Sequence, residues 1–252
     1  FGLMIGDTGV TSGQTLPVIA NVAIPLNETG LEGYSFVSIT GDQECPAVLG
    51  GTVTLTEGQH ISCTINNDDN IPHLTLIKNI ESRHGGTAVL TDWTLTATGP
   101  TTISGAGGVT SDSSFSAGAY TLSESAGPSG YAASSWSCTG VENDENTITL
   151  GLGDSAVCTI TNSDIQAKLT VIKHVENNNG GNAEAEDFTM LVTGVNATNT
   201  SFAGSETGTI VGLDAGTYSV DESSYFGYSK TLGTDCSGTI AIGEEKTCII
   251  TN

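Results

Sequence analysis

The sequence has few basic residues. Its 252 residues include only six lysines and arginines against 28 aspartates and glutamates, which gives a formal net charge of −22 at pH 7. A surface of this sign repels nucleic-acid phosphates and anionic lipid headgroups, so we expect neither a nucleic acid nor a membrane surface as a partner. We interpret the acidity as a source of solubility.

Long hydrophobic runs are lacking as well. The nearest to one, residues 16–24, is interrupted by Pro17 and is shorter than the roughly 18 apolar residues of a membrane-spanning helix. The N-terminus has no basic region and is too short for a signal peptide, so we expect a mature chain or a fragment. No segment has a helical period. Val, Ile and Leu instead recur in short alternating runs, which indicates half-buried strands.

The later two thirds of the chain repeat themselves. Three blocks, which begin with LTLIKNIE and LTVIKHVE, occur twice at matching places: residues 74–81 with 169–176, 117–131 with 215–228, and 157–162 with 247–252. Repetition at this spacing is typical of an array of small domains. We therefore predict an all-β chain, a tandem array of three small β-sandwich repeats at residues 1–70, 71–164 and 165–252.

The first predicted repeat contains only the later part of this pattern. Residues 22–34 match the middle block, residues 62–67 match the closing block, and Phe1–Ile5 is expected to be what remains of a further strand. Nothing corresponds to the opening LTLIK strand. The joints between repeats are short and contain no flexible Gly/Ser tract, so we expect a stiff rod of domains placed end to end.

The six cysteines fall into one pair in each repeat. Repetition selects this pairing, since each repeat must be able to close by itself. Zinc binding is the alternative, but no CxxC spacing or clustered histidine accompanies the cysteines. We predict three disulfides and hence an oxidising compartment outside the cytoplasm: Cys45–Cys63, Cys138–Cys158 and Cys236–Cys248.

Several polar residues occupy strand positions that should face the interior. Side chains alternate between the two faces of a strand, and Lys78 shares its face with Leu74 and Leu76. By the same alternation, the middle strand places one Glu on its interior face and the closing strand places one Asn on its interior face. The resulting sets are Lys78, Glu124 and Asn162 in the second repeat, and Lys173, Glu222 and Asn252 in the third.

These three groups should meet, because an unpaired buried charge costs several kcal/mol. An apolar site lowers the pKa of a lysine amine and raises that of a glutamic acid, which yields a nucleophile and a proton donor. The amine can then attack the Asn carboxamide and form a Lys–Asn isopeptide bond as ammonia leaves. The alternative is that both lysines extend to solvent at strand ends while both glutamates are solvated at turns.

With these residues the sequence resembles the collagen-adhesin B-type domains, which have a prealbumin-like fold and form stalk and pilin modules of surface proteins. The resemblance rests on the opening-strand Lys, on a Y-x-L/V-x-E block followed by Gly-Tyr, and on the closing Thr-Asn. It implies self-generated isopeptide bonds with Glu as the catalytic acid. The residues implied are Lys78, Glu124 and Asn162, and Lys173, Glu222 and Asn252.

In the first repeat Glu28 and Asn67 occupy the corresponding places, but their lysine strand is missing. A sandwich without this strand exposes a hydrophobic groove and unpaired backbone groups. Either the sequence is cut within a domain, or a neighbouring molecule supplies the strand, and head-to-tail donation of this kind builds filaments. The donor would be Phe1–Ile5 or a segment outside this sequence, and a lysine on it would join subunits at Asn67.

Other candidate sites are weaker. The four histidines are scattered without ligand spacing, and the acidic turns are better explained as solvated than as Ca²⁺ sites, so we expect no metal site and no cofactor. Three Asn-x-Ser/Thr sequons predict glycosylation, and these are at Asn27, Asn196 and Asn199.

The function expected from these observations is structural and not enzymatic. We predict a subunit or stalk of an extracellular filament, pilus or sheath on the cell surface, which polymerises head to tail with copies of itself. The alternative is a cell-surface adhesin that binds a surface ligand through loops such as 196–208. A carbohydrate-processing enzyme is disfavoured, because no candidate acid pair lies outside the core-facing glutamates.

Overall fold

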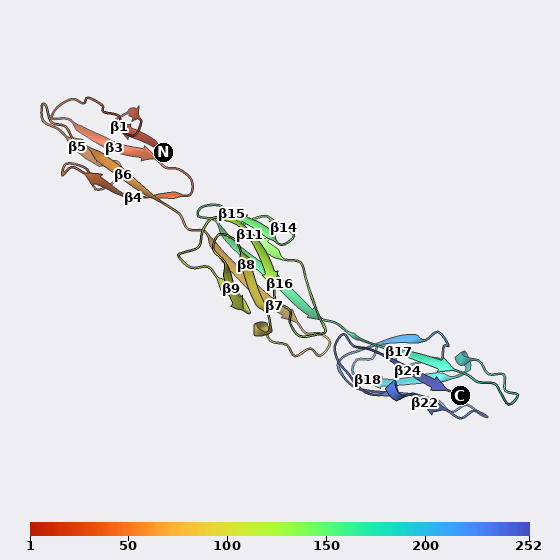
Figure 1. Cartoon of the computed structure of the whole chain (residues 1–252). Helices are drawn as coiled ribbons and strands as arrows, with labels where there is room; N and C mark the ends of the chain where they lie inside the picture. Colours follow the sequence, from red (N-terminus) through yellow and green to blue (C-terminus); the bar gives the residue numbers. More distant parts are fainter.

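The computed structural model describes all 252 residues and confirms the all-β prediction. The only helical segments are three 3₁₀ turns of three residues each, at Leu90–Asp92, Ala185–Asp187 and Thr234–Cys236. The structure contains no helix with the length and hydrophobicity that a bilayer crossing requires. The strands form three groups that lie end to end along one line, with the N-terminus and C-terminus in the outer groups (Figure 1).

The second and third repeats are each built from two sheets, which we name after the charged residue that each supplies. In the second repeat the lysine sheet has the order β10 (Gly108–Thr110), β7 (His73–Glu81), β16 (Ser155–Asp164) and β12 (Tyr131–Ala133), and β13 (Ser137–Thr139) also pairs with β16. Its glutamate sheet has the order β14 (Asn143–Asp144), β15 (Thr147–Leu150), β11 (Gly118–Glu124), β8 (Thr94–Thr98) and β9 (Ile103–Ala106).

The third repeat has the same plan with fewer strands. Its lysine sheet has the order β20 (Thr209–Leu213), β17 (Ala167–His174), β24 (Glu245–Thr251) and β22 (Thr231–Leu232). Its glutamate sheet has the order β19 (Ser201–Ala203), β18 (Thr189–Gly194), β21 (Gly216–Glu222) and β23 (Ser237–Ile240).

The opening strand and the closing strand of each complete repeat are parallel neighbours. In the second repeat, Lys78 lies opposite Ile160 in the β7–β16 pair. In the third, Lys173 lies opposite Ile250 in the β17–β24 pair. Because side chains alternate along both strands, the lysine and the asparagine two residues beyond its partner point into the same interior.

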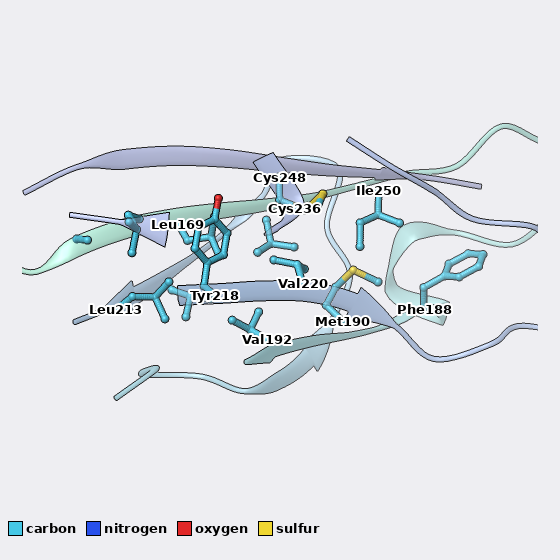
Figure 2. Close-up of a cluster of buried hydrophobic side chains, with 14 of the residues drawn as sticks. Leu169, Phe188, Met190, Val192, Leu213, Tyr218, Val220, Cys236, Cys248 and Ile250 are labelled. Atoms are coloured by element: carbon cyan, nitrogen blue, oxygen red, sulfur yellow. A yellow bond between two sulfur atoms is a disulfide. The ribbon is translucent and has the colours of Figure 1, made fainter. Parts of the chain in front are cut away.

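Each complete repeat has its own hydrophobic core. The core cluster contains 13 buried residues in the second repeat and 15 in the third. Figure 2 shows the third core, in which Tyr218 lies toward one end and Phe188 toward the other, with Cys236 and Cys248 between the sheets.

The first repeat is built differently. Its four-stranded sheet has the order β2 (Thr8–Val10), β1 (Gly2–Ile5), β3 (Ala23–Thr29) and β5 (Thr52–Thr54), and it faces a sheet of only two strands, β4 (Tyr34–Gly41) and β6 (Cys63–Asp69). Leu26 and Val53 are its only buried hydrophobic residues. The closing strand β6 pairs with β4 alone, so its other edge has no partner.

The prediction that Phe1–Ile5 could be a donated strand is wrong. Residues 2–5 form β1, which pairs with both β2 and β3 in its own repeat. Both edges of β1 are therefore occupied, because the following turn at Gly6 and Asp7 folds the chain back into a hairpin. The alternative expectation, that Phe1–Ile5 is what remains of a framework strand, agrees with the pairing. Leu3 lies opposite Glu28, as Leu95 lies opposite Glu124.

The three disulfides have the predicted pairing, one within each repeat: Cys45–Cys63, Cys138–Cys158 and Cys236–Cys248, and no cysteine is free. In every repeat one of the two cysteines lies on the closing strand. Such a bond is expected to contribute on the order of 3 kcal/mol by limiting the unfolded chain.

The joints between repeats are held by the same two backbone hydrogen bonds. At the first joint the N–H of Asn70 donates to the carbonyl of Gly33, and the carbonyl of Asn70 accepts from Gly153, both at 2.8 Å. The second joint repeats this arrangement at 2.9 and 2.7 Å, with Gly130, Ile165 and Gly243. These bonds tie each linker residue to the repeats on both sides, which explains the straight line of domains in Figure 1.

Candidate functional site: the buried Lys–Glu–Asn triads

The predicted polar residues of the second repeat meet in its interior. Lys78 comes from β7, Glu124 from the end of β11 and Asn162 from β16. The Nζ of Lys78 lies 2.8 Å from Oε1 of Glu124, and Nδ2 of Asn162 donates to the same oxygen at 3.2 Å. One carboxylate oxygen thus contacts both the amine and the carboxamide.

The third repeat forms the same triad. The Nζ of Lys173 lies 3.4 Å from Oε2 of Glu222, and Nδ2 of Asn252 donates to Oε1 of Glu222 at 2.6 Å. The side chain of Lys173 is fully buried and that of Glu222 is 2% exposed. Burial lowers the pKa of the Lys173 amine below its ordinary value of 10.5, and the nearby Glu222 offsets only part of this effect.

An aromatic ring covers each lysine. The Nζ of Lys78 lies 4.9 Å from the ring centre of Trp93, and that of Lys173 lies 4.3 Å from the ring centre of Phe188. Both rings are almost wholly buried. They exclude water from the amine while their faces attract its positive charge.

The polar atoms of the triads are not fully satisfied. Four buried atoms have no hydrogen-bond partner: Nζ of Lys78, Oδ1 of Asn162, Oε2 of Glu222 and Oδ1 of Asn252. The amine of Lys78 is at ion-pair distance from Glu124 without the alignment of a hydrogen bond. An unsatisfied buried polar group costs about 1–3 kcal/mol. The triads therefore lower the stability of both repeats as long as these atoms have no partners.

The first repeat contains two members of a triad. Nδ2 of Asn67 donates to Oε2 of Glu28 at 3.1 Å, which matches the Asn–Glu contact of the other repeats. Phe1 packs edge-on against Tyr34 at 5.5 Å, as Trp93 packs against Tyr131 at 5.3 Å. Phe1 is nevertheless 51% exposed, since no lysine strand lies beneath it.

Sequence reasoning missed Asp164, whose carboxylate organises the loop after the lysine strand. It accepts the backbone N–H groups of Arg83, His84 and Gly86 at 2.7–2.9 Å. Although burial opposes the effect, these donors lower the pKa of Asp164 below its ordinary value. The side chain continues the alternating interior face of Cys158, Ile160 and Asn162, which is the signal that could have revealed it.

A contact between the second and third repeats was also missed. Nδ1 of His84 lies 2.7 Å from Oδ1 of Asp214, and Nδ2 of Asn196 donates to the other oxygen of Asp214 at 2.6 Å. Hydrogen bonding to Asn196 lowers the pKa of Asp214 against a smaller effect of burial, and His84 lowers it further. These contacts add a side-chain link to the backbone bonds of the second joint.

The sequons lie on the surface. The side chains of Asn27, Asn196 and Asn199 are exposed, and Asn27 lies on the face of β3 opposite to Glu28. Asn196 has a positive φ of 47° and uses its Nδ2 to hold Asp214. Glycosylation at the three positions stays a prediction. No three acidic, histidine or cysteine side chains converge as they would around a metal ion.

Comparison with known proteins gives the family. The model of the prealbumin-like fold domain matches residues 69–160 and again residues 164–250. No protein of curated function matches the chain in sequence.

Three solved structures are similar to this chain. The Bacillus anthracis TIE protein shares 15% identity over 91% of this chain and 41% of its own, with a TM-score of 0.42. A variant of the major pilin from Streptococcus pyogenes shares 14% identity over 73% of this chain and 99% of its own, with a TM-score of 0.30. Two B repeat units of the collagen binding protein of Staphylococcus aureus share 14% identity over 96% of this chain and 60% of their own, with a TM-score of 0.27. This chain thus spans less than half the length of the TIE chain.

The two family matches cover the second and third repeats, each with its own sandwich, disulfide and triad. Together they account for well over half of the sequence. The chain therefore belongs to the prealbumin-like fold domain family.

Proposed function

We propose that the chain is a structural subunit or stalk of an extracellular filament, in which each complete repeat is closed by a disulfide and by a Lys–Asn isopeptide bond. The observation that carries the proposal is the recurrence of one buried triad in two repeats. Lys78, Glu124 and Asn162 have the same register as Lys173, Glu222 and Asn252. In both triads the glutamate lies within ion-pair distance of the lysine amine and accepts a hydrogen bond from Nδ2 of the asparagine.

The contacts suit the formation of an amide. The neutral lysine amine attacks Cγ of the asparagine, a new C–N bond forms, and the bond from Cγ to the carboxamide nitrogen breaks. Glutamic acid polarises the carboxamide and carries the amine proton to the departing nitrogen, which leaves as ammonia. The folded core holds the groups together, so the step is effectively unimolecular. The lowered pKa of Lys173 increases the fraction of neutral amine.

The bond would also remove one of the unsatisfied groups, the amine of Lys78. A buried ion pair between Lys and Glu contributes little net stability, because desolvation offsets the attraction. Conversion of the amine to an amide removes a buried positive charge and an orphaned donor. A covalent link between the parallel first and last strands of a repeat would resist a pulling force directly.

Peptide mapping tests the proposal. Digestion of the reduced protein is expected to yield one peptide that links Lys78 to Asn162 and another that links Lys173 to Asn252. Glu124→Ala should abolish only the first and Glu222→Ala only the second, while the exposed Glu142→Ala serves as a control that changes neither. Recovery of all four residues in unlinked peptides from the unaltered protein contradicts the proposal.

The other elements of the proposal follow from the same features. Three disulfides are consistent with a location outside the cytoplasm, and the reaction of the glutamates would be confined to the protein itself, which is therefore not an enzyme. The resemblance of the motifs to collagen-adhesin B-type domains supports a stalk. In a filament, a neighbouring molecule would complete the first repeat through the open edge of β6.

Adhesion is the second candidate function. Phe226, next to Gly227 with its positive φ of 86°, is fully exposed in the third repeat. A large exposed apolar side chain of this kind suits contact with a ligand. Loss of attachment to a surface ligand on Phe226→Ser, with filament formation unchanged, would support adhesion, and equal attachment would exclude this residue.

A further inference from the structure

The second and third repeats differ in one linker of their glutamate and lysine sheets. In the third repeat residues 204–208, Gly-Ser-Glu-Thr-Gly, join β19 to β20, whereas in the second repeat Gly107 alone joins β9 to β10. Both linkers begin alike. The N–H of Gly204 donates to the carbonyl of Phe188 at 2.8 Å, and the N–H of Gly107 donates to that of Trp93 at 2.9 Å. Residues 204–208 are therefore an inserted loop of the third repeat.

The inserted loop continues the edge of the lysine strand. β20 pairs with β17 as far as Val171. Beyond this point the N–H of Lys173 donates to the carbonyl of Ser205 at 2.9 Å, and the N–H of Val175 donates to Oε1 of Glu206 at 2.9 Å. The loop thus takes the place of a strand at this edge, and it fixes the backbone of the lysine that belongs to the triad.

The loop also packs against the side chain of this lysine. Gly204 is buried, and a Cβ at this position would lie 2.7 Å from Cβ of Lys173 and 2.4 Å from the carbonyl oxygen of Ala185. Glycine alone permits so close an approach. The loop therefore lies directly on the stem of Lys173, whose side chain is fully buried.

The corresponding place in the second repeat is open. A hollow of about 710 Å³ lies there, and its lining includes residues 78–82 and 88–90. Leu90 is 46% exposed, whereas Ala185 at the corresponding position of the third repeat is 4% exposed. The two triads therefore differ in how the end of the lysine strand is held, although their lysine, glutamate and asparagine correspond.

The loop brings a second carboxylate toward Lys173. Oε2 of Glu206 lies 2.9 Å from Nδ1 of His174. Hydrogen bonds from His174 and Val175 lower the pKa of Glu206 below its ordinary value, so this side chain is charged at neutral pH. His174 itself is half exposed and points to the opposite face of its strand from Lys173.

Two charged groups face the amine of Lys173, namely Glu222 from β21 and Glu206 from the inserted loop. Burial lowers the pKa of Lys173, while Glu222 and, to a smaller extent, Glu206 raise it. Because the neutral amine is the nucleophile, a negative charge that favours the ammonium form moves the reaction to higher pH.

We propose that the inserted loop is a positioning element for the cross-link of the third repeat: it holds Lys173 in place for attack on Asn252, and the charge of Glu206 determines the pH range of that attack. The inference rests on the proposed function, since it concerns the same bond. The amine bonds to Cγ of Asn252 and ammonia leaves, as described for both triads. Glu206 acts through Lys173 and is therefore a positioning residue.

The first test compares charge variants of the full chain. Protein kept unfolded in denaturant from synthesis onward is diluted into a redox buffer at a series of pH values, and the linked peptides are quantified over time. Glu206→Gln keeps an acceptor for the N–H of Val175 but removes the charge, so the rise of the third cross-linking rate with pH should move to lower pH. An unchanged pH profile overturns the role of the charge.

Two controls accompany this comparison. Glu186→Gln removes an exposed charge from the same repeat, and it should leave the pH profile where it is. The bond between Lys78 and Asn162 forms in the same molecules and should show the same pH profile in every variant. A shift of equal size in Glu186→Gln, or in the bond of the second repeat, overturns a specific action of Glu206.

The second test removes the loop. Replacement of residues 204–208 by one glycine copies the linker of the second repeat. The rate on the high-pH plateau, where the amine is neutral, should fall roughly tenfold or more, because misplacement of a reacting group by about 1 Å can cost about 100-fold. An unchanged plateau rate, in a third repeat that amide exchange shows to be folded, overturns the positioning role.

If the shortened chain does not fold, Gly204→Ala gives the same comparison, since its methyl group presses on the stem of Lys173. A slower plateau rate in this variant supports the positioning role, and an equal rate overturns it.

A third measurement does not depend on the cross-link. In Asn252→Ala, which cannot form the bond, NMR titration of labelled lysine gives the pKa of the Lys173 amine. Addition of Glu206→Gln should lower this pKa, and equal values with and without the charge overturn the action of Glu206. Absence of both cross-links from the unaltered protein contradicts the proposed function instead, so the two failures are distinguishable.

Discussion

In the second and third repeats a lysine strand fills the space between the two sheets, whereas in the first repeat the same space is open. The Glu–Asn contact and the aromatic pair are nevertheless present in the first repeat. The difference shows that the glutamate and asparagine take up their positions without the lysine strand. The complete repeats, in which this strand adds buried apolar side chains, have cores of 13 and 15 residues, whereas the first repeat has two buried hydrophobic residues.

The largest expected effect distinguishes Glu124 from Glu28. Glu124→Ala should prevent the cross-link, which costs about 4 kcal/mol by the chain-entropy argument for a long loop. It also leaves the amine of Lys78 buried without a partner, at a further cost of about 3–5 kcal/mol. Glu28→Ala removes only a hydrogen bond to Asn67 and should cost about 1 kcal/mol.

Calorimetric unfolding of both variants measures this difference, with Glu142→Ala as a control on an exposed glutamate. Equal destabilisation by Glu28→Ala and Glu124→Ala would show that the lysine strand does not determine the role of the glutamate.

Removal of the aromatic rings that cover the lysines has the next largest expected effect on stability. Trp93→Ala and Phe188→Ala should each cost about 3–5 kcal/mol, because both rings are buried and cover a lysine. Phe1→Ala should cost about 1 kcal/mol or less, since half of Phe1 is exposed. Denaturant titration followed repeat by repeat measures the costs. A cost of Phe1→Ala equal to that of Trp93→Ala would contradict the expected difference between the repeats.

Removal of a disulfide should cost about 3 kcal/mol in any repeat, but with different consequences. The double change Cys138→Ser and Cys158→Ser leaves the other 12 residues of the core cluster in place, so the second repeat should stay folded. Cys45→Ser with Cys63→Ser should unfold the first repeat, where only Leu26 and Val53 are buried. Amide hydrogen exchange measures both outcomes, and a first repeat that stays protected without its disulfide contradicts the expectation.

The smallest expected effect is the pH dependence of cross-linking and of stability in the third repeat. Because burial lowers the pKa of Lys173, cross-linking should accelerate as pH rises and level off below 10.5. In Asn252→Ala, which cannot form the bond, the folded state releases the amine proton at a lower pH than the unfolded state. Stability should therefore rise with pH between these two pKa values. The rate of ammonia release during refolding and the unfolding free energy of the variant are the measurements. A rate independent of pH would contradict a reacting neutral amine.

Much of the site could be predicted from the sequence because strands alternate. The count from Leu74 and Leu76 places Lys78 inside, and the same count places Asn162 and Glu222 inside. Repetition then determines which cysteines pair. Both arguments use only local geometry and similarity between repeats.

The remaining features depend on contacts that local patterns do not encode. The role of Phe1–Ile5 could not be derived, because a short apolar run fits either a framework strand or a donated one, and only the Gly6 hairpin decides. The contact of His84 with Asp214 joins two repeats across 130 positions of sequence and depends on the loops at the joint.

The most direct test is the mass of the unaltered, fully reduced chain of residues 1–252. The account predicts a mass lower than that of the sequence by two ammonias, one for each complete repeat, with the first repeat contributing none. A reduced mass equal to that of the sequence would contradict the central claim that the buried triads react.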